Sequence, residues 1–332
     1  MRDKTRASDV SKVPVIDLGA LDPARPDRDA LRELDTACRD HGFFLLTGHG
    51  MHALIEAVWR QTRVFFALPR ERKRGVERSR DNALGYFDRE LTKRKRDRKE
   101  VFDYADDAHD IANAGFGRSR WPQGLPGFRD NLIAYSRGCA ALTNQVLAAL
   151  YTALGLSPAE VPVAVGAEHT AFVRLNHYPV EDPVAQDERH DAAQLGDMAL
   201  HHHTDPGVIT LLLQDDVGGL QTRSRDAGWI DVPPHPDTIV VNMSDMLQVL
   251  TNDNYRASLH RVLPVPGRDR YSIVYFSMPR HDALIEPAPA LYEGAAGYRS
   301  FTWTEFISGR LGDNFADYGV DDIQIADYRT GP

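Results

Sequence analysis

The sequence predicts a mainly β core, built as a barrel or double sheet and flanked by α-helices. Two observations support this prediction. After residue 166 of the 332-residue chain, short strand-like segments follow one another closely, and Gly and Pro residues separate them. Before residue 166, long segments instead carry apolar residues at helical spacing. Many short strands with such turn signals favour a barrel or double sheet over a parallel α/β sheet.

Helices are expected mainly in the first half of the chain. Apolar residues recur at helical spacing over residues 27–41 and 51–66. The longest helix is expected near residues 129–154, where apolar residues share one face and Gly155 follows as a stop signal. Another helix is expected near residues 304–311.

Strands are expected in both halves of the chain, and the polar stretch 181–194 between two of them is expected to be a mobile loop. The expected strands are short apolar or alternating runs, and turn signals at residues 218–219, 233–234 and 266–267 separate several of them. The expected strands are residues 13–18, 43–47, 171–178, 208–214, 219–222, 238–242, 259–265 and 270–277.

Composition narrows the class of protein. The formal net charge is −9, which argues against nucleic acid as a partner held by charge. Two cysteines cannot build a disulfide framework, and no apolar run is long enough to span a membrane. The basic run 89–99 is interrupted by acidic residues, so we expect a solvated face or a lid there. We expect a soluble cytoplasmic protein, monomeric or weakly homo-oligomeric, with no membrane partner.

The strongest local signal is the segment 201–205, His-His-His-Thr-Asp. Residues two apart on a strand share a face at about 6.5–7 Å, so His203 and Asp205 can reach one metal ion while His202 points away. His260 follows downstream. Two imidazoles and one carboxylate on one side of a metal leave three positions open, which suits non-haem Fe(II). Zinc also accepts these ligands, but we find no H-E-x-x-H motif and no obvious general-base Glu.

A second motif, Arg270-Tyr271-Ser272, follows ten residues after His260. Arg270 and Ser272 share one face of an expected strand. A guanidinium binds a carboxylate bidentately and a serine adds a donor, so the pair suits one end of a dicarboxylate. Alone, Arg270 fits a surface salt bridge and His260 a core histidine. The ordered set of motifs makes a joint coincidence improbable.

With these motifs in this order, the chain resembles the iron(II)/2-oxoglutarate-dependent oxygenases, specifically the isopenicillin N synthase-like branch. The similarity extends over about residues 13–279, most of the chain. The matching segments are residues 13–18, 37–38, 42–50, 85–86, 97–100, 121–122, 174–179, 203–207, 219–221, 260–262 and 270–272.

The resemblance implies a distorted double-stranded β-helix, or jelly roll, as the core. It implies three regions that we expect to form one compact unit: an N-terminal region over residues 13–125, the Fe(II)/2-oxoglutarate core over residues 165–282 and a helical extension over residues 283–332. It assigns three iron ligands, His203, Asp205 and His260. It also places four residues at the co-substrate: Arg270 and Ser272 at the distal carboxylate, with Asn176 and Tyr178 nearby.

The chain departs from the family pattern at two places. Ser244 stands where the family usually has Gly, and it would be strained if the position needs a positive φ. The pair His201 and His202 is additional, and it is a candidate either for binding stray metal or for shaping the entrance to the site.

The resemblance implies an enzyme that uses Fe(II), 2-oxoglutarate and O₂ to oxidise an unactivated C–H bond of a small-molecule metabolite, with release of succinate and CO₂. Hydroxylation is the default outcome. One alternative is an oxidase of the same branch that closes rings or desaturates without 2-oxoglutarate. A zinc hydrolase and an inactive binding module are further alternatives.

Five residues are expected to line the substrate pocket. Three of them, Phe87, Phe102 and Tyr104, lie in the segment after Gly85-Tyr86, and two, Met246 and Phe276, lie in or near core strands. Such apolar walls favour a small molecule with a sizeable apolar body. Cations of the basic run 89–99 are expected to guide an acidic group of that molecule to the mouth of the pocket.

Overall fold

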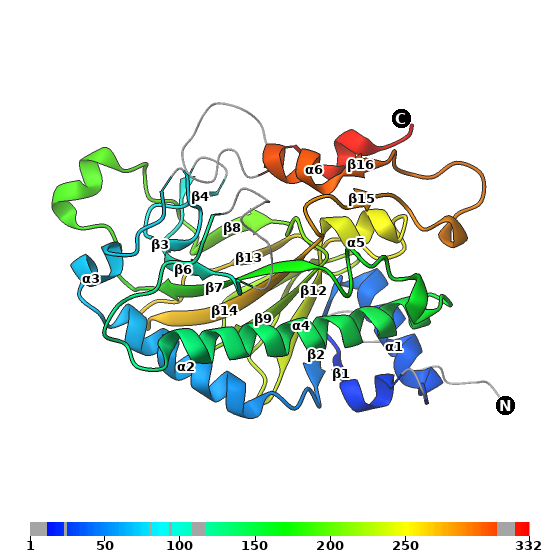
Figure 1. Cartoon of the computed structure of the whole chain (residues 1–332), viewed down its shortest axis with the longest axis horizontal. Coiled ribbons are helices and arrows are strands. Elements are labelled where there is room, and N and C mark those ends of the chain that lie inside the picture. The colour runs from blue at the N-terminus through cyan, green and yellow to red at the C-terminus, as the bar shows by residue number, and fades with distance from the viewer. Residues whose placement is uncertain are drawn as a thin grey trace.

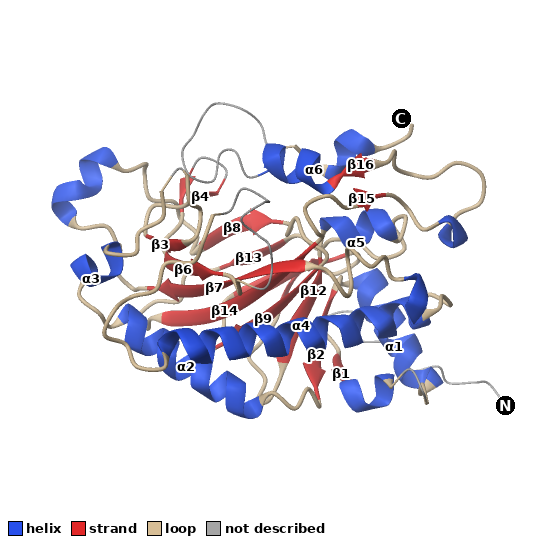
Figure 2. Ribbon diagram, in the orientation of Figure 1, coloured by secondary structure: helices blue, strands red, loops and turns tan. Residues whose placement is uncertain are grey.

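The computed structural model describes residues 12–22, 25–79, 81–92, 95–107, 117–310 and 323–331. Two β-sheets form its centre (Figures 1 and 2). The larger sheet has eight strands in the order β1-β2-β12-β9-β14-β7-β6-β3, and the smaller has four in the order β11-β10-β13-β8. Except for the parallel pair β1 and β2, the strand pairs in these two sheets are antiparallel.

The strands and helices have the following bounds. The large sheet contains β1 (Val15–Asp17), β2 (Phe43–Thr47), β3 (Gly85–Phe87), β6 (Glu100–Tyr104), β7 (Thr170–Tyr178), β9 (Ile209–Gln214), β12 (Ile239–Met243) and β14 (Arg270–Met278). The small sheet contains β8 (Leu200–His203), β10 (Leu220–Ser224), β11 (Gly228–Asp231) and β13 (His260–Val262). Two short pairs are β4 (Leu91–Thr92) with β5 (Lys95–Arg96), and β15 (Leu284–Ile285) with β16 (Phe301–Thr302). The α-helices are α1 (Arg28–Asp40), α2 (His52–Phe66), α3 (Arg70–Arg74), α4 (Phe128–Ala153), α5 (Asp245–Leu250) and α6 (Trp303–Arg310).

The predicted fold class is confirmed, and α4 is the long helix expected near residues 129–154. Helix α4 packs against β14, β7 and β9 of the large sheet, with α1 and α2 beside it (Figure 1). Within the described ranges, no helix is long and apolar enough to cross a membrane.

The two faces of the large sheet serve different cores, because successive side chains of a strand point to opposite faces. On β14, Ile273 and Tyr275 belong to the core beneath α4, which also contains Leu132 of that helix. On the opposite face, Val240 of β12 joins a second core with Val262 of the small sheet. The space between the two sheets is therefore the interior of the jelly roll, and β14 carries Arg270, Ser272 and Phe276 toward it.

The expected mobile loop at residues 181–194 is held to the N-terminal region by ion pairs. The guanidinium of Arg96 lies 2.6 Å from the Asp182 carboxylate, and Arg70 lies 2.5 Å from Glu188. Three cations of the basic run pair with carboxylates: Arg96 with Asp182, Arg89 with Glu188, and Lys99 with Glu90. Because nearby carboxylates already pair with these three cations, they give no support to our expectation that the basic run guides an anion into the pocket, and that expectation stays a prediction.

Candidate metal centre

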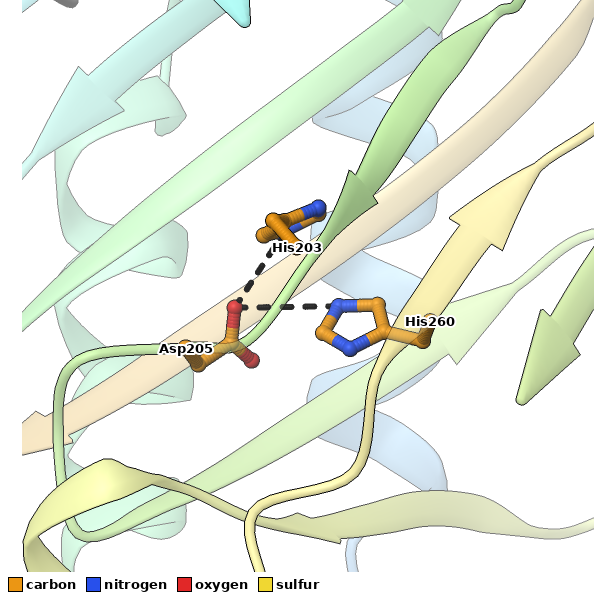
Figure 3. A group of neighbouring side chains, drawn as sticks. All are labelled: His203, Asp205 and His260. Atoms are coloured by element: carbon orange, nitrogen blue, oxygen red, sulfur yellow. Dashed lines mark ion pairs between the residues drawn. The ribbon is translucent and has the colours of Figure 1, made fainter. Parts of the chain in front are cut away.

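The three predicted metal ligands come together between two neighbouring strands of the small sheet (Figure 3). His203 is the last residue of β8, and His260 is the first residue of β13 and its direct cross-strand partner. Asp205 lies beyond the end of β8, so the expectation that it shares a strand with His203 was wrong. The turn after β8 nevertheless returns its carboxylate toward both imidazoles.

The distances between the three side chains suit a single metal ion. Oδ1 of Asp205 lies 3.5 Å from Nε2 of His203 and 3.7 Å from Nε2 of His260. One ligand atom from each residue lies within 4.8 Å of the others. Separations of this size allow all three atoms to contact a central ion at about 2.0–2.2 Å, the usual range for imidazole and carboxylate ligands.

Hydrogen bonds orient each ligand for metal binding. Nδ1 of His203 donates to the carbonyl of His201 at 2.9 Å, and Nδ1 of His260 donates to the carbonyl of Ser258 at 3.1 Å. Each imidazole therefore presents the Nε2 lone pair to the site, as metal-binding histidines commonly do.

The Asp205 carboxylate is oriented in the same manner. Its Oδ2 atom accepts hydrogen bonds from the Thr210 hydroxyl at 2.6 Å and from the Asn242 amide at 2.9 Å. Oδ1 is left facing the two histidines. Neither Thr210 nor Asn242 was predicted as a site residue. The available signals were Thr210 as the one polar residue within the apolar run 208–213, and the Asn242-Met243-Ser244-Asp245 motif.

The surroundings of Asp205 and His260 favour the protonation states in which these side chains bind a metal ion. Burial alone would raise the pKa of Asp205, but the two neighbouring histidines, His260 and His203, and the hydrogen bond from Asn242 hold it well below its ordinary value. Burial and the proximity of His203 lower the pKa of His260 to about 4. At neutral pH the site thus offers a carboxylate and a neutral His260, which are the ligand forms of these groups.

The two additional histidines do not join the metal ligands among the described residues. The Nδ1 atom of His201 lies 2.9 Å from the Asp97 carboxylate, and the His202 ring lies 6.4 Å from that of Trp229. His202 thus points away from His203 as expected, and His201 takes part in the charged network beside the site.

A buried guanidinium, that of Arg270, lies on β14 of the large sheet. Nε of Arg270 donates to the carbonyl of Gly218 at 2.7 Å, and the group lies 4.9 Å from the centre of the Tyr178 ring. Among the described residues, its Nη1 and Nη2 atoms are buried and have no hydrogen-bond partner. Leaving a buried charged donor unpaired is costly, so these two atoms fit a bidentate carboxylate ligand.

The other predicted co-substrate residues are grouped next to Arg270. Tyr178 is its cross-strand partner on β7, and Asn176 is the partner of Ser272. The Asn176 amide donates to the Ser272 hydroxyl at 3.2 Å. The predicted set therefore occupies one continuous patch on the interior face of β7 and β14.

The structure separates the five expected pocket residues. Phe102 and Tyr104 belong to the core beneath α4, where the Tyr104 hydroxyl donates to the carbonyl of Leu132 at 3.0 Å. Met246 belongs to the same core. These three expectations were wrong, because this core lies outside the interior of the jelly roll.

Phe276 and Phe87 remain as pocket candidates. Phe276 is the cross-strand partner of Thr210, whose hydroxyl binds Asp205, so Phe276 faces the interior beside the metal ligands. It stacks on Phe172 with ring centres 4.7 Å apart. On β3, the Phe87 ring lies 4.0 Å from the guanidinium of Arg78.

A buried charged network, which the sequence did not predict, lies beyond this aromatic pair. Arg174 follows Phe172 by two residues on β7 and contacts both Glu90 and Asp103 at 2.8 Å. Glu90 also accepts from Lys99 at 2.8 Å and from Arg78 at 3.1 Å. Positive and negative groups alternate, so the network forms a neutralised wall rather than an unpaired charge.

Two imidazoles, one carboxylate and a buried unpaired guanidinium inside a double-sheet core define the class of non-haem iron enzymes that take a dicarboxylate co-substrate. Comparison with known proteins names the family. Residues 169–279 match the model of the 2OG-Fe(II) oxygenase superfamily, and residues 13–124 match that of the N-terminal region of non-haem dioxygenases in morphine synthesis.

Relatives of known function span nearly the whole chain. A homoarginine-6-hydroxylase from Glycine max is 32% identical over 94% of this chain and 99% of its own length. Gibberellin 2-beta-dioxygenase 1 from Arabidopsis thaliana is 30% identical and covers 92% of each chain. The chain therefore belongs to the 2-oxoglutarate/Fe(II) oxygenase superfamily, and it is an Fe(II)- and 2-oxoglutarate-dependent oxygenase.

Solved structures agree in fold. The structure of JOX2 in complex with 2OG, Fe and JA aligns with a TM-score of 0.78 and 28% identity, over 96% of this chain and 90% of that one. The dioxygenase for auxin oxidation in rice aligns with a TM-score of 0.73 and 26% identity, over 96% of this chain and 100% of that one. Family membership removes the zinc hydrolase from the alternatives.

Proposed function

We propose that His203, Asp205 and His260 hold the iron of this oxygenase and that Arg270 anchors 2-oxoglutarate. The observation that carries the proposal is the convergence of three oriented ligand atoms beside a buried guanidinium with two unpaired donors. Iron held by these residues would supply the oxidising chemistry, with O₂ and 2-oxoglutarate as co-substrates.

The protein contributes fixed positions and charges to this reaction. Carbonyl oxygens on the backbone hold both imidazoles in the tautomer that presents Nε2. Arg270 is fixed by Gly218 and by the Tyr178 ring, so its outer edge is rigid before the co-substrate binds. Such preorganisation lowers the entropy that must be lost on binding. Ser272 and Asn176 provide further polar groups at the same carboxylate.

We propose that Phe276 and Phe172 form the wall against which the substrate lies. Phe276 is only partly buried although it faces the interior, and it adjoins the residue that binds Asp205. This wall supports a small organic molecule with a flat or apolar part. Some relatives are hydroxylases by name, which favours hydroxylation over ring closure as the outcome.

An acidic group on the substrate is not part of this proposal, because three cations of the basic run already pair with carboxylates. Cys38 and Cys139 are buried and unbridged, which supports our proposal that the enzyme works in a reducing compartment such as the cytoplasm. We propose a monomer or weak homo-oligomer, on the basis of the net charge of −9.

Metal binding tests the ligand assignment directly. Equilibrium dialysis of the metal-free protein against Fe(II) under argon should give one ion per chain. Asp205→Ala should lower the affinity for Fe(II) at least about 100-fold, because it removes the only charged ligand and leaves two neutral imidazoles. His203→Ala should act similarly.

His202→Ala is the matched control, since this neighbouring histidine points away from the site. It should bind Fe(II) within about twofold of the unchanged protein. Full iron occupancy in Asp205→Ala, or equal losses in Asp205→Ala and His202→Ala, would contradict the assignment. Circular dichroism should show that each variant keeps its fold.

A further inference from the structure

Ser244 occupies the position before α5, where serine usually caps a helix. Its side chain makes no capping hydrogen bond, although the residue is fully buried. Its φ is −111°, in the extended region, so the strain considered for a residue at this position does not arise. The buried hydroxyl instead has a partner outside the helix.

The hydroxyl of Ser244 lies 3.3 Å from that of Thr210, which in turn lies 2.6 Å from Oδ2 of Asp205. A threonine hydroxyl can donate only one hydrogen bond, and Thr210 donates it to the Asp205 carboxylate. The Ser244 hydroxyl must then be the donor to Thr210. The three groups form a directed chain of hydrogen bonds that ends on a metal ligand.

The backbone fixes this chain at both ends. The N–H of Ser244 donates to the carbonyl of Val208 at 3.1 Å. The N–H of Asp245 donates to the carbonyl of Asp205 at 2.8 Å, which ties the start of α5 directly to the ligand turn. The Ser244 hydroxyl is thus held in reach of Thr210 by the same segment that positions Asp205.

We propose that Ser244 is a positioning residue for the metal centre, acting through the Thr210 hydroxyl on the Asp205 carboxylate. The inference rests on the proposed assignment of Asp205 as an iron ligand. Hydrogen bonds in a chain polarise one another, so Ser244 makes Thr210 a stronger donor to Oδ2. It also holds the Thr210 hydroxyl in the rotamer that bonds Asp205, which keeps Oδ1 directed at the ion.

The test measures Fe(II) affinity under argon, and Co(II) affinity as a second probe, without turnover. Residues that orient metal ligands typically change affinity 10- to 100-fold, so Thr210→Val should lie in that range. Ser244 is one hydrogen bond further from Asp205 than Thr210 is, so Ser244→Ala should weaken Fe(II) binding about three- to tenfold. The absorption band of the anaerobic Fe(II)/2-oxoglutarate complex should shift in the same order.

The double variant Ser244→Ala/Thr210→Val distinguishes a positioning role of Ser244 from a role in packing alone. If Ser244 acts through Thr210, Ser244→Ala should have no further effect on affinity in the Thr210→Val background. Ser277→Ala is the matched control, because Ser277 is an equally buried serine on β14 whose hydroxyl has no hydrogen-bond partner among the described residues. Ser277→Ala should bind metal like the unchanged protein.

An unchanged affinity in Ser244→Ala would overturn the inference, as would an equal loss in both backgrounds. Ser244→Gly provides a second removal of the hydroxyl if the alanine variant does not fold, and it should show the same coupling to Thr210. Failure of Asp205→Ala to lose metal would instead refute the proposed ligand set, so the two proposals fail separately.

Discussion

Replacement of Arg270 should selectively weaken the binding of 2-oxoglutarate. Two nitrogen atoms of this guanidinium are buried without partners, and the rest of the group is fixed by Gly218 and Tyr178. A bidentate, charge-assisted contact of this kind contributes about 2–3 kcal/mol. Its loss in Arg270→Gln should raise the KM for 2-oxoglutarate about 30- to 150-fold.

Arg270→Lys should show a smaller rise, because an ammonium keeps the charge but cannot form the planar fork. Succinate release at varied 2-oxoglutarate concentration measures the KM. Anaerobic titration of the Fe(II) protein, followed by absorption, measures binding without turnover. The affinity for Fe(II) itself should remain unchanged, since Arg270 contacts none of the three ligands in the structure.

Arg268 offers a matched control two residues away. Its side chain is 59% exposed and pairs with Asp216 at the surface. Arg268→Gln should leave the KM for 2-oxoglutarate within about twofold, since exposed pairs contribute little. Normal binding of 2-oxoglutarate by Arg270→Gln, or an equal loss of binding in Arg270→Gln and Arg268→Gln, would contradict this prediction. Oxidation of substrate at full rate without 2-oxoglutarate would favour the oxidase alternative.

Two further predictions concern the pocket wall and the charged network. Phe276→Ala should raise the KM for substrate several-fold and increase succinate release without product, whereas Phe102→Ala should mainly lower stability. Parallel assays of product and succinate, together with thermal unfolding, measure these effects. A raised KM in Phe102→Ala and an unchanged KM in Phe276→Ala would show that the pocket lies elsewhere. Glu90→Gln should lower the free energy of unfolding by about 3–5 kcal/mol, because it leaves buried cations undercompensated. Burial alone would raise the pKa of Glu90, but Arg174, Lys99 and Arg78 hold it well below 4.5, so its stabilisation is present above pH 4.5 and is lost as the pH falls further. Urea titrations should therefore show a shallower loss at acid pH in Glu90→Gln than in the unchanged protein; parallel curves would contradict this account.

The sequence predicted those parts of the fold that depend on local pattern. Helix α4 has a continuous apolar face and a glycine stop, and strand β2 is a short apolar run that ends at Gly48. The interior arrangement of Arg270 and Ser272 followed from their spacing of two on one strand. Both kinds of signal are contained within a few neighbouring residues.

The predictions from sequence were wrong where the environment of a residue depends on segments far away in the chain. Strand β6 is buried at all five positions, since one face meets the helices and the other meets the charged network. Its sequence therefore shows no alternation, and nothing local indicated that Phe102 faces the helices. The cations of residues 89–99 pair partly with Asp182 and Glu188, which only folding brings near.

The order of strands in the large sheet has a consequence for synthesis of the chain. Strand β2, at residues 43–47, has β1 on one side and β12, at residues 239–243, on the other. At 5–20 residues per second, β12 leaves the ribosome about 10–40 s after β2. During that interval β2 exposes an unpaired edge with Phe44 and Leu46 beside it, a template for wrong pairing. We expect nascent chains of this protein to need chaperone protection until residue 243 has emerged, and pulse-labelled aggregation to fall sharply beyond that length.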